Sequence, residues 1–139
     1  MDRTIEAIES FLDDHHLLTL ATSGERLWCC SMFYAYLPDE LAFIVASDPE
    51  TEHMHNVAKN ASVAGTVALE TKIVGKIRGI QFAGTMAKAE TAEARDRYFG
   101  RFPYARAMNP TLWTIRLDEI KMTDNTLGFG KKLMWKRAL

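Results

Sequence analysis

Two hydroxyls and an imidazole stand close together in the segment LAFIVASDPETEHMHN, at positions 47, 51 and 53. An apolar run ends at Ser47, Asp48 and Pro49 predict a turn, and a helical pattern begins at about His53. The start of a helix offers free backbone N–H groups and the positive end of the helix dipole, which together attract phosphate. Ser47, Thr51 and His53 could then donate hydrogen bonds to a phosphorylated ligand. Ser and Thr are also the commonest helix caps, so ordinary capping is the favoured interpretation of this segment taken alone.

A second set of polar residues lies within a strand predicted over 77–89 and in the segment just before it. Lys72, Lys76 and Arg78 could supply positive charge, and Gln81 could hydrogen-bond a ring edge or a phosphate. A solvated hairpin explains the two lysines equally well. Arg78 and Gln81 are harder to dismiss, because they stand among Ile, Gly, Phe and Ala, where a buried polar group needs a partner.

Aromatic side chains could stack on a flat ring, and they cluster in two parts of the chain: Trp28, Tyr34, Tyr36, Trp113 and Trp135. For each of them singly, packing in an aromatic core is the simpler interpretation. Metal and nucleophile motifs are missing from the sequence, which contains no HExxH, CxxC, GxSxG, P-loop or GxGxxG pattern. His53 and His55 would lie on different helix faces. We therefore expect no metal site.

The elements that must position these residues follow from apolar periodicity. Helices are expected over 3–14, over 53–60, and from a Thr91 cap to Pro103. Strands are expected over 17–22, 28–37, 41–47, 62–70 and 77–89, and the segments 112–117 and 119–123 are expected to form one further strand or two. Both faces of 28–37 are apolar, which predicts a strand between two packed layers. Gly79 and Gly84 mark a bend, a bulge or a close ligand approach. Strands joined by hairpins in this order close most easily into an antiparallel barrel.

Composition limits the function classes. The chain has 139 residues, 47% hydrophobic and 25% charged, so we expect one globular domain over 1–139. A net charge of −1 gives no bulk preference for nucleic acid or an anionic membrane, so phosphate recognition must be local. No apolar run has membrane-spanning length, and the acidic N-terminal segment is unlike a signal peptide. Cys29 and Cys30 are neighbours that would strain a disulfide, so we expect free thiols in a reducing cytoplasm.

The chain resembles the FMN-binding split-barrel flavoproteins, the family that includes pyridoxamine 5′-phosphate oxidase, and it looks closest to a short bacterial branch. The resemblance rests on the order and spacing of LLTLAT, WCCSMFYAYL, LAFIVASDPETEHMHNV, SVAGTV and RGIQFAGTMAKAE. It implies a split antiparallel β-barrel with flanking helices, and a homodimer that holds FMN in a groove at its interface. It also implies cofactor-binding roles for Trp28, Cys29, Cys30, Ser31, Met32, Ala46, Ser47, Thr51, His53, Gln81 and Trp135, with Thr51 and His53 at the phosphate.

The chain departs from the family pattern in three places. It has no basic residue on 28–37, where the oxidase has arginine and lysine. It carries Thr51-Glu52-His53 where the family often has Ser-x-Lys, so FMN affinity should rise as His53 protonates. It lacks counterparts of the longer terminal parts that bind pyridoxal phosphate, so we do not expect pyridoxamine phosphate oxidase activity.

The resemblance thus implies an FMN-dependent reductase or oxidase, with NAD(P)H as a plausible electron donor. A non-catalytic FMN- or haem-binding protein on the same barrel is the alternative. His15, His16, His53 or His55 could then offer an axial ligand, although solvated histidines are the simpler interpretation. A structural module that has lost its site is a further alternative, and the missing basic residues on 28–37 favour it.

Overall fold

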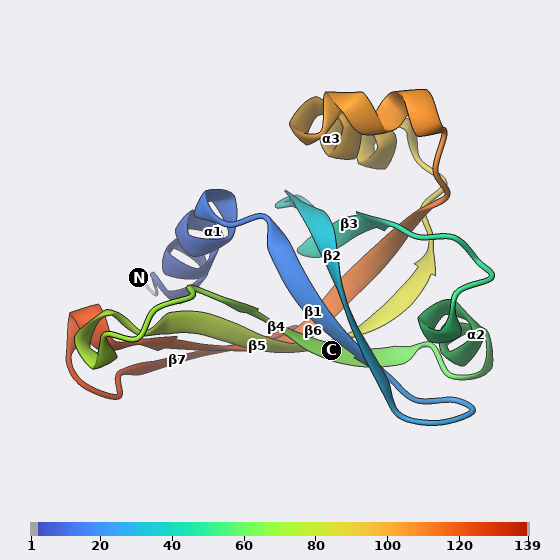
Figure 1. Cartoon of the computed structure of the whole chain (residues 1–139). Helices are drawn as coiled ribbons and strands as arrows, with labels where there is room; N and C mark the ends of the chain where they lie inside the picture. Colours follow the sequence, from blue (N-terminus) through green and yellow to red (C-terminus); the bar gives the residue numbers. More distant parts are fainter. Residues whose placement is uncertain (1–2, 139) are drawn as a thin grey trace.

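In the computed structural model, which describes residues 3–138, seven strands form one antiparallel sheet (Figure 1). The strands are β1 (Leu17–Thr22), β2 (Trp28–Leu37), β3 (Ala42–Ala46), β4 (Ser62–Ala68), β5 (Arg78–Lys88), β6 (Leu112–Asp124) and β7 (Lys132–Lys136). The α-helices are α1 (Thr4–Asp14), α2 (Glu52–Lys59) and α3 (Ala92–Arg101). Three short 3₁₀ helices are η1 (Val74–Lys76), η2 (Pro103–Met108) and η3 (Asn125–Leu127). None of the described helices is long and apolar enough to cross a membrane.

The sheet closes into a split barrel because β6 has two partners along one edge. The strand order is β3-β2-β1-β4-β5-β6-β7, and β3 also pairs with β6. The first half of β6, Leu112 to Arg116, pairs with β3, and its second half, Glu119 to Thr123, pairs with β7. Six strands therefore close on themselves and β7 extends the sheet beyond the closure. The predicted split antiparallel barrel with flanking helices is confirmed.

Two apolar clusters hold the fold together. The larger fills the barrel, where the rings of Phe43 and Phe82 meet at 5.1 Å, and α1 adds Phe11 to it from outside the sheet. The smaller lies between the β2–β3 hairpin and α3, around Tyr98 and Phe99. Only the last four residues of β2, 34–37, are buried on both faces. The expected strand between two layers is therefore correct for 34–37 and wrong for 28–33, which no second layer covers within the described chain.

The predicted helices formed close to their expected bounds. Thr91 caps α3 by accepting a hydrogen bond from the N–H of Ala94 at 3.1 Å, and Pro103 follows its end. The segments 112–117 and 119–123, expected as one strand or two, form a single strand. Its register against β5 shifts at Gly84, which confirms this glycine as a bulge position. A Cβ at Gly84 would lie 2.4 Å from the Arg116 carbonyl oxygen, so the two backbones approach as only glycine allows.

The sequence expectations included neither β7 nor the three 3₁₀ helices. The tail forms β7, with Leu133 and Trp135 packed against the barrel core. Leu133 and Trp135 alternate with Lys132, Met134 and Lys136, a short strand pattern that the GFG segment before it concealed. The segment between α3 and β6, for which no element was predicted, contains η2.

Candidate functional site

The end of β3 and the start of α2 bring the three predicted polar residues into contact. The Ser47 hydroxyl oxygen lies 2.5 Å from Nε2 of His53, and the Thr51 hydroxyl oxygen lies 3.2 Å from the same nitrogen. Pro49 and its neighbours turn the chain between strand and helix, so residues separated by up to six positions meet. The sequence predicted this cluster, and the structure assembles it.

From this segment alone, the favoured interpretation was that its hydroxyl residues cap the helix. Thr51 does not cap α2 with its side chain. Thr51 occupies the N-cap position of α2, but its side chain makes no capping hydrogen bond. Its hydroxyl instead donates to the Asp48 carbonyl at 2.8 Å. Because that hydroxyl proton is used, Thr51 can meet Nε2 of His53 only as an acceptor, which requires the Nε2–H tautomer of the ring. In that tautomer the Ser47 hydroxyl proton is free to point toward a ligand, and first-turn N–H groups of α2 are available to the same ligand.

Backbone contacts fix the position of Ser47. Its N–H donates to the Thr111 carbonyl at 3.0 Å, and the indole N–H of Trp113 donates to its carbonyl at 2.8 Å. A cavity of about 440 Å³ opens beside it, lined by Ala46, Ser47, Asp48, Pro49, Met108, Asn109, Pro110 and Thr111. The cluster therefore borders an accessible space and is held from both β3 and β6.

The electrostatics of the cluster are mixed. Burial lowers the pKa of His53, so the ring is neutral at pH 7. Two carboxylates nearby already have partners: Glu52 pairs with the Arg26 guanidinium at 2.7 Å, and Asp48 accepts from the N–H of Glu50 at 2.9 Å. Such pairing reduces the repulsion that these carboxylates would exert on an incoming anion.

Sequence reasoning missed the residue that anchors α2. Asn56 is fully buried, and its side-chain amide donates to the Thr22 hydroxyl at 2.9 Å and to the Arg26 carbonyl at 2.7 Å. Its side-chain oxygen accepts from the N–H of Glu25 at 2.8 Å. These bonds tie α2 to the β1–β2 turn, some 30 residues away in sequence, and no local pattern signals such a contact. They also bring Arg26 to the first turn of α2.

The candidates on β2 divide between two faces of the strand. Trp28 is 41% exposed, and Cys30 and Met32 on the same face are half-buried against the core. Cys29 and Ser31 point to the opposite face and are exposed. Because the faces alternate, these five residues cannot all line one ligand within a protomer. Both cysteines are free thiols, as predicted, and burial raises the pKa of Cys30 to about 11.

Arg78 lies away from this cluster and has an internal partner. Its Nε lies 3.4 Å from a carboxylate oxygen of Asp124, and its guanidinium lies 5.2 Å from the centre of the Phe11 ring. The Nε makes no well-aligned hydrogen bond, so the contact with Asp124 is an ion pair only. Asp124 is therefore the charge partner of Arg78 inside the fold, while the buried Nε itself has no hydrogen-bond partner.

Gln81 and Trp135 are also apart from the cluster within the protomer. Gln81 is exposed, in a shallow hollow shared with Lys121 and Met134. Trp135 is half-buried on β7 and lies under the Arg137 guanidinium, 5.7 Å from its centre. β7 and α2 lie toward opposite ends of the barrel (Figure 1), so one protomer does not bring Trp135 to the Ser47 cluster.

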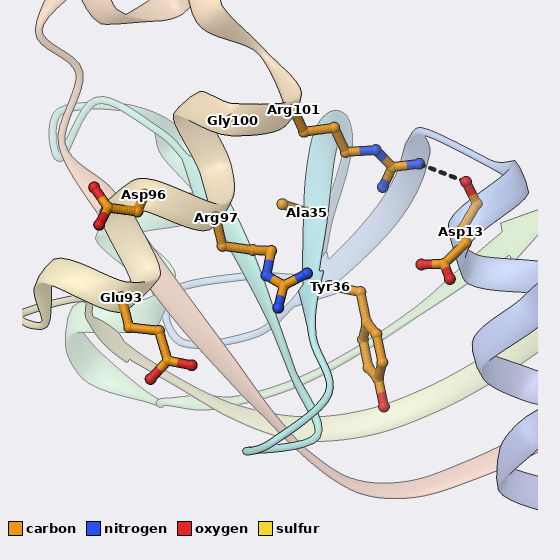
Figure 2. Close-up of a pocket in the computed structure, with 8 residues that line it drawn as sticks. All are labelled: Asp13, Ala35, Tyr36, Glu93, Asp96, Arg97, Gly100 and Arg101. Carbon is orange, nitrogen blue, oxygen red and sulfur yellow. Dashed lines mark hydrogen bonds between the residues drawn. The ribbon is translucent and has the colours of Figure 1, made fainter.

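A groove of mixed polarity, of about 810 Å³, lies between α1, β2 and α3 (Figure 2). Arg97 extends into it toward Tyr36, and carboxylates of Asp13, Glu93 and Asp96 surround it. Arg101 spans its rim and donates to the backbone carbonyls of Tyr34, Asp13 and His15, which is a structural role. The groove holds none of the residues that the sequence proposed, and its mixed charge selects no ligand class.

A more apolar cavity of about 560 Å³ adjoins the Ser47 cavity, and sequence reasoning missed it. Its walls come from β2, the end of β3, α3 and the η2 segment: Phe33, Ala46, Tyr98, Arg101, Phe102, Pro103, Tyr104, Ala105, Met108 and Pro110. Tyr104 and Met108 are 93% and 82% exposed, unusual values for large apolar side chains. Ala46, Met108 and Pro110 line both cavities, so the cavity beside Ser47 and the apolar cavity share one wall.

Comparisons with known proteins agree with this architecture. The pyridoxamine 5′-phosphate oxidase family matches residues 4–123. A UPF0306 protein of Cronobacter sakazakii is 50% identical over 138 residues, which cover 96% of each chain. A haem-binding protein from Mycobacterium smegmatis superposes with a TM-score of 0.80 at 16% identity, over 98% of this chain and 59% of that one. HutZ, a haem storage protein from Vibrio cholerae, gives 0.69 at 14% identity, over 84% and 92%. The structural likenesses establish the fold.

Proposed function

Because the chain belongs to the pyridoxamine 5′-phosphate oxidase family, alongside its UPF0306 relatives, we propose that it is a flavoprotein that binds FMN. The observation that carries the proposal is the Ser47–Thr51–His53 cluster at an N-terminus that Thr51 leaves uncapped. A phosphate there would accept from first-turn N–H groups of α2 and from the Ser47 hydroxyl. His53 would add charge on protonation.

The proposed ring site lies between two copies of the chain. Residues 28–33 of β2 have no covering layer in the protomer, and Trp28 and Phe33 are 41% and 56% exposed. A second copy would cover this surface and form a groove in which an isoalloxazine ring could stack. Gln81, exposed on β5, would reach the cofactor from the partner protomer. Cys29 and Ser31, on the exposed face of β2, would face that groove, whereas Cys30 and Met32 pack against the core and would support the strand from inside.

Bound FMN would supply hydride and electron transfer, and we propose a reductase or oxidase reaction with NAD(P)H or a small molecule as the donor. The protein's part would be to hold the phosphate and to flank the ring. The apolar cavity beside Ala46 offers room for an apolar substrate. The free thiols Cys29 and Cys30 support a reducing compartment such as the cytoplasm.

Titration with FMN and riboflavin tests the proposal directly, since the two ligands differ only in the phosphate. Flavin fluorescence quenching should show FMN binding at least tenfold more tightly than riboflavin. Light scattering should show a dimer. Equal affinity for the two flavins would place the phosphate outside the α2 cluster, and absence of binding to either would refute the flavoprotein proposal.

Haem is a second candidate, favoured by the apolar cavity beside His16. The His16 ring lies 6.5 Å from that of Phe102, which lines the cavity, and both solved neighbours described above are haem proteins by name. A haem in this cavity would give a Soret band that shifts in His16→Ala and is unchanged in His55→Ala. A spectrum insensitive to His16 would leave FMN as the sole candidate.

A further inference from the structure

Two turns that are distant in sequence meet at the end of the barrel away from α2 (Figure 1). One contains η1 and the other contains η3. The backbone N–H of Asn125 donates to the Ile77 carbonyl at 2.9 Å, and its side-chain amide donates to the Val74 carbonyl at 2.8 Å. Residues 72–77 and 127–132 therefore form one surface, here called the lysine tip.

The lysine tip exposes large apolar side chains that make no core. Phe129 is 84% exposed and Leu127 is 58% exposed, and Ile73, Val74 and Ile77 are 41–56% exposed. Phe129 stands between Gly128 and Gly130, which have φ angles of 130° and 73° and nothing packed against them. Exposed apolar residues that cluster in one place indicate an interaction surface, whereas single exposed apolar residues scattered over a protein do not.

The charge of the tip has a single sign. Lys72, Lys76, Lys131 and Lys132 are exposed, and within the described chain none of them forms an ion pair. No carboxylate lies within the tip, and Asp124 beside it is buried against Arg78. The whole chain has a net charge of −1, so the rest of the molecule is acidic and this basic surface is local. The net charge of the whole chain therefore does not reveal this local basic surface, and for that reason it indicated no preference for membranes.

We propose that the lysine tip docks on the surface of an anionic phospholipid bilayer. Apolar side chains rimmed by lysines match a bilayer interface, where rings and aliphatic chains enter the headgroup region and ammonium groups meet lipid phosphates. The tip is built from projecting turns, a shape suited to a flat, soft surface. If two copies of the chain paired through their lysine tips about a two-fold axis, the four lysines of one tip would face the four lysines of the other. The resulting repulsion argues against a second copy as the binding partner of the tip.

Vesicle co-sedimentation of the full chain tests the proposal. The protein should pellet with phosphatidylcholine vesicles that contain phosphatidylglycerol and stay in solution with phosphatidylcholine alone. Raised salt should weaken binding, because the lysine contribution is screened. Lys131→Ala with Lys132→Ala should reduce binding at least fivefold at low salt, and Lys88→Ala, which removes an exposed lysine at the end of β5, should not.

A second pair of variants separates the contribution of apolar insertion into the bilayer from the contribution of lysine charge. Phe129→Ser should reduce vesicle binding at least fivefold at any salt concentration, whereas Met108→Ser, equally exposed but outside the tip, should leave it unchanged. No binding to anionic vesicles at low salt, or binding unaffected by the tip variants, would overturn the proposal. So would a change of oligomeric state in Phe129→Ser, measured by light scattering, because the tip would then be an interface between copies of this chain.

Discussion

Nε2 of His53 lies 2.5 Å from the hydroxyl oxygen of Ser47, and this contact joins the end of β3 to the first turn of α2. Ser47 is held by its backbone hydrogen bonds at the end of β3, and His53 is held by its position in the first turn of α2. A ligand that accepts from both elements would therefore meet groups that are already in place, which reduces the ordering cost of binding.

Ser47→Ala should weaken FMN binding roughly 5- to 30-fold, or about 1–2 kcal/mol, from one lost hydrogen bond to a charged group. Riboflavin affinity should stay unchanged, because the phosphate is the partner that is lost. Flavin fluorescence titration measures both. Ser62→Ala, on the exposed side of β4, is the control and should bind like the wild type. An unchanged FMN affinity in Ser47→Ala would remove this hydroxyl from the phosphate site.

Burial lowers the pKa of His53 below the ordinary histidine value of 6.5, so the unfolded chain binds this proton more tightly than the folded chain does. Stability should therefore fall as the pH drops through about 6.5 toward the lower folded value. Urea unfolding between pH 7.5 and 5.5 measures this slope. His53→Gln should show a shallower slope over the same window. An equal slope in both proteins would mean that His53 is as solvated in the folded chain as in the unfolded one.

FMN should reverse the effect of burial, because a bound phosphate favours the protonated ring. The increase in melting temperature that FMN causes should thus be larger at pH 6 than at pH 8. The phosphate itself gains a proton near pH 6, which acts in the opposite direction. Comparison with His53→Gln removes that contribution, since both proteins bind the same ligand. If the two proteins respond alike to pH, His53 does not contact the phosphate.

The sequence predicted the barrel and the Ser47 cluster because both depend on local patterns. Strand alternation, turn residues and the helix start are each readable within about ten residues. The partner of Arg78 is Asp124, which lies at the far end of β6 and pairs only after the barrel closes. The apolar cavity likewise depends on η2 lying beside Phe33, a contact that no local pattern encodes. Long-range contacts of this kind were beyond prediction.

Asn56→Ala should cost about 2–4 kcal/mol of unfolding free energy, because it removes a buried amide and leaves several polar groups of the β1–β2 turn without partners. Urea denaturation measures the loss. Asn60→Ala, at the exposed end of α2, is the matched control and should cost less than about 1 kcal/mol. Similar losses in the two variants would show that the turn satisfies its groups with water. FMN affinity should also fall in Asn56→Ala, since α2 loses its anchor.

Gly84→Ala should destabilise the barrel by about 1–3 kcal/mol, because the new methyl group would press on backbone that cannot move without disturbing the pairing of β5 with β6. Its Cβ would lie 2.4 Å from the Arg116 carbonyl oxygen, at the point where the register shifts. Gly75→Ala in η1 is the control, since nothing lies within 4 Å of its Cβ position. Thermal unfolding of both variants distinguishes the two cases. If Gly84→Ala loses no more stability than Gly75→Ala, the bulge relaxes around the new methyl group. Glycine would then not be required where the register of β5 against β6 shifts.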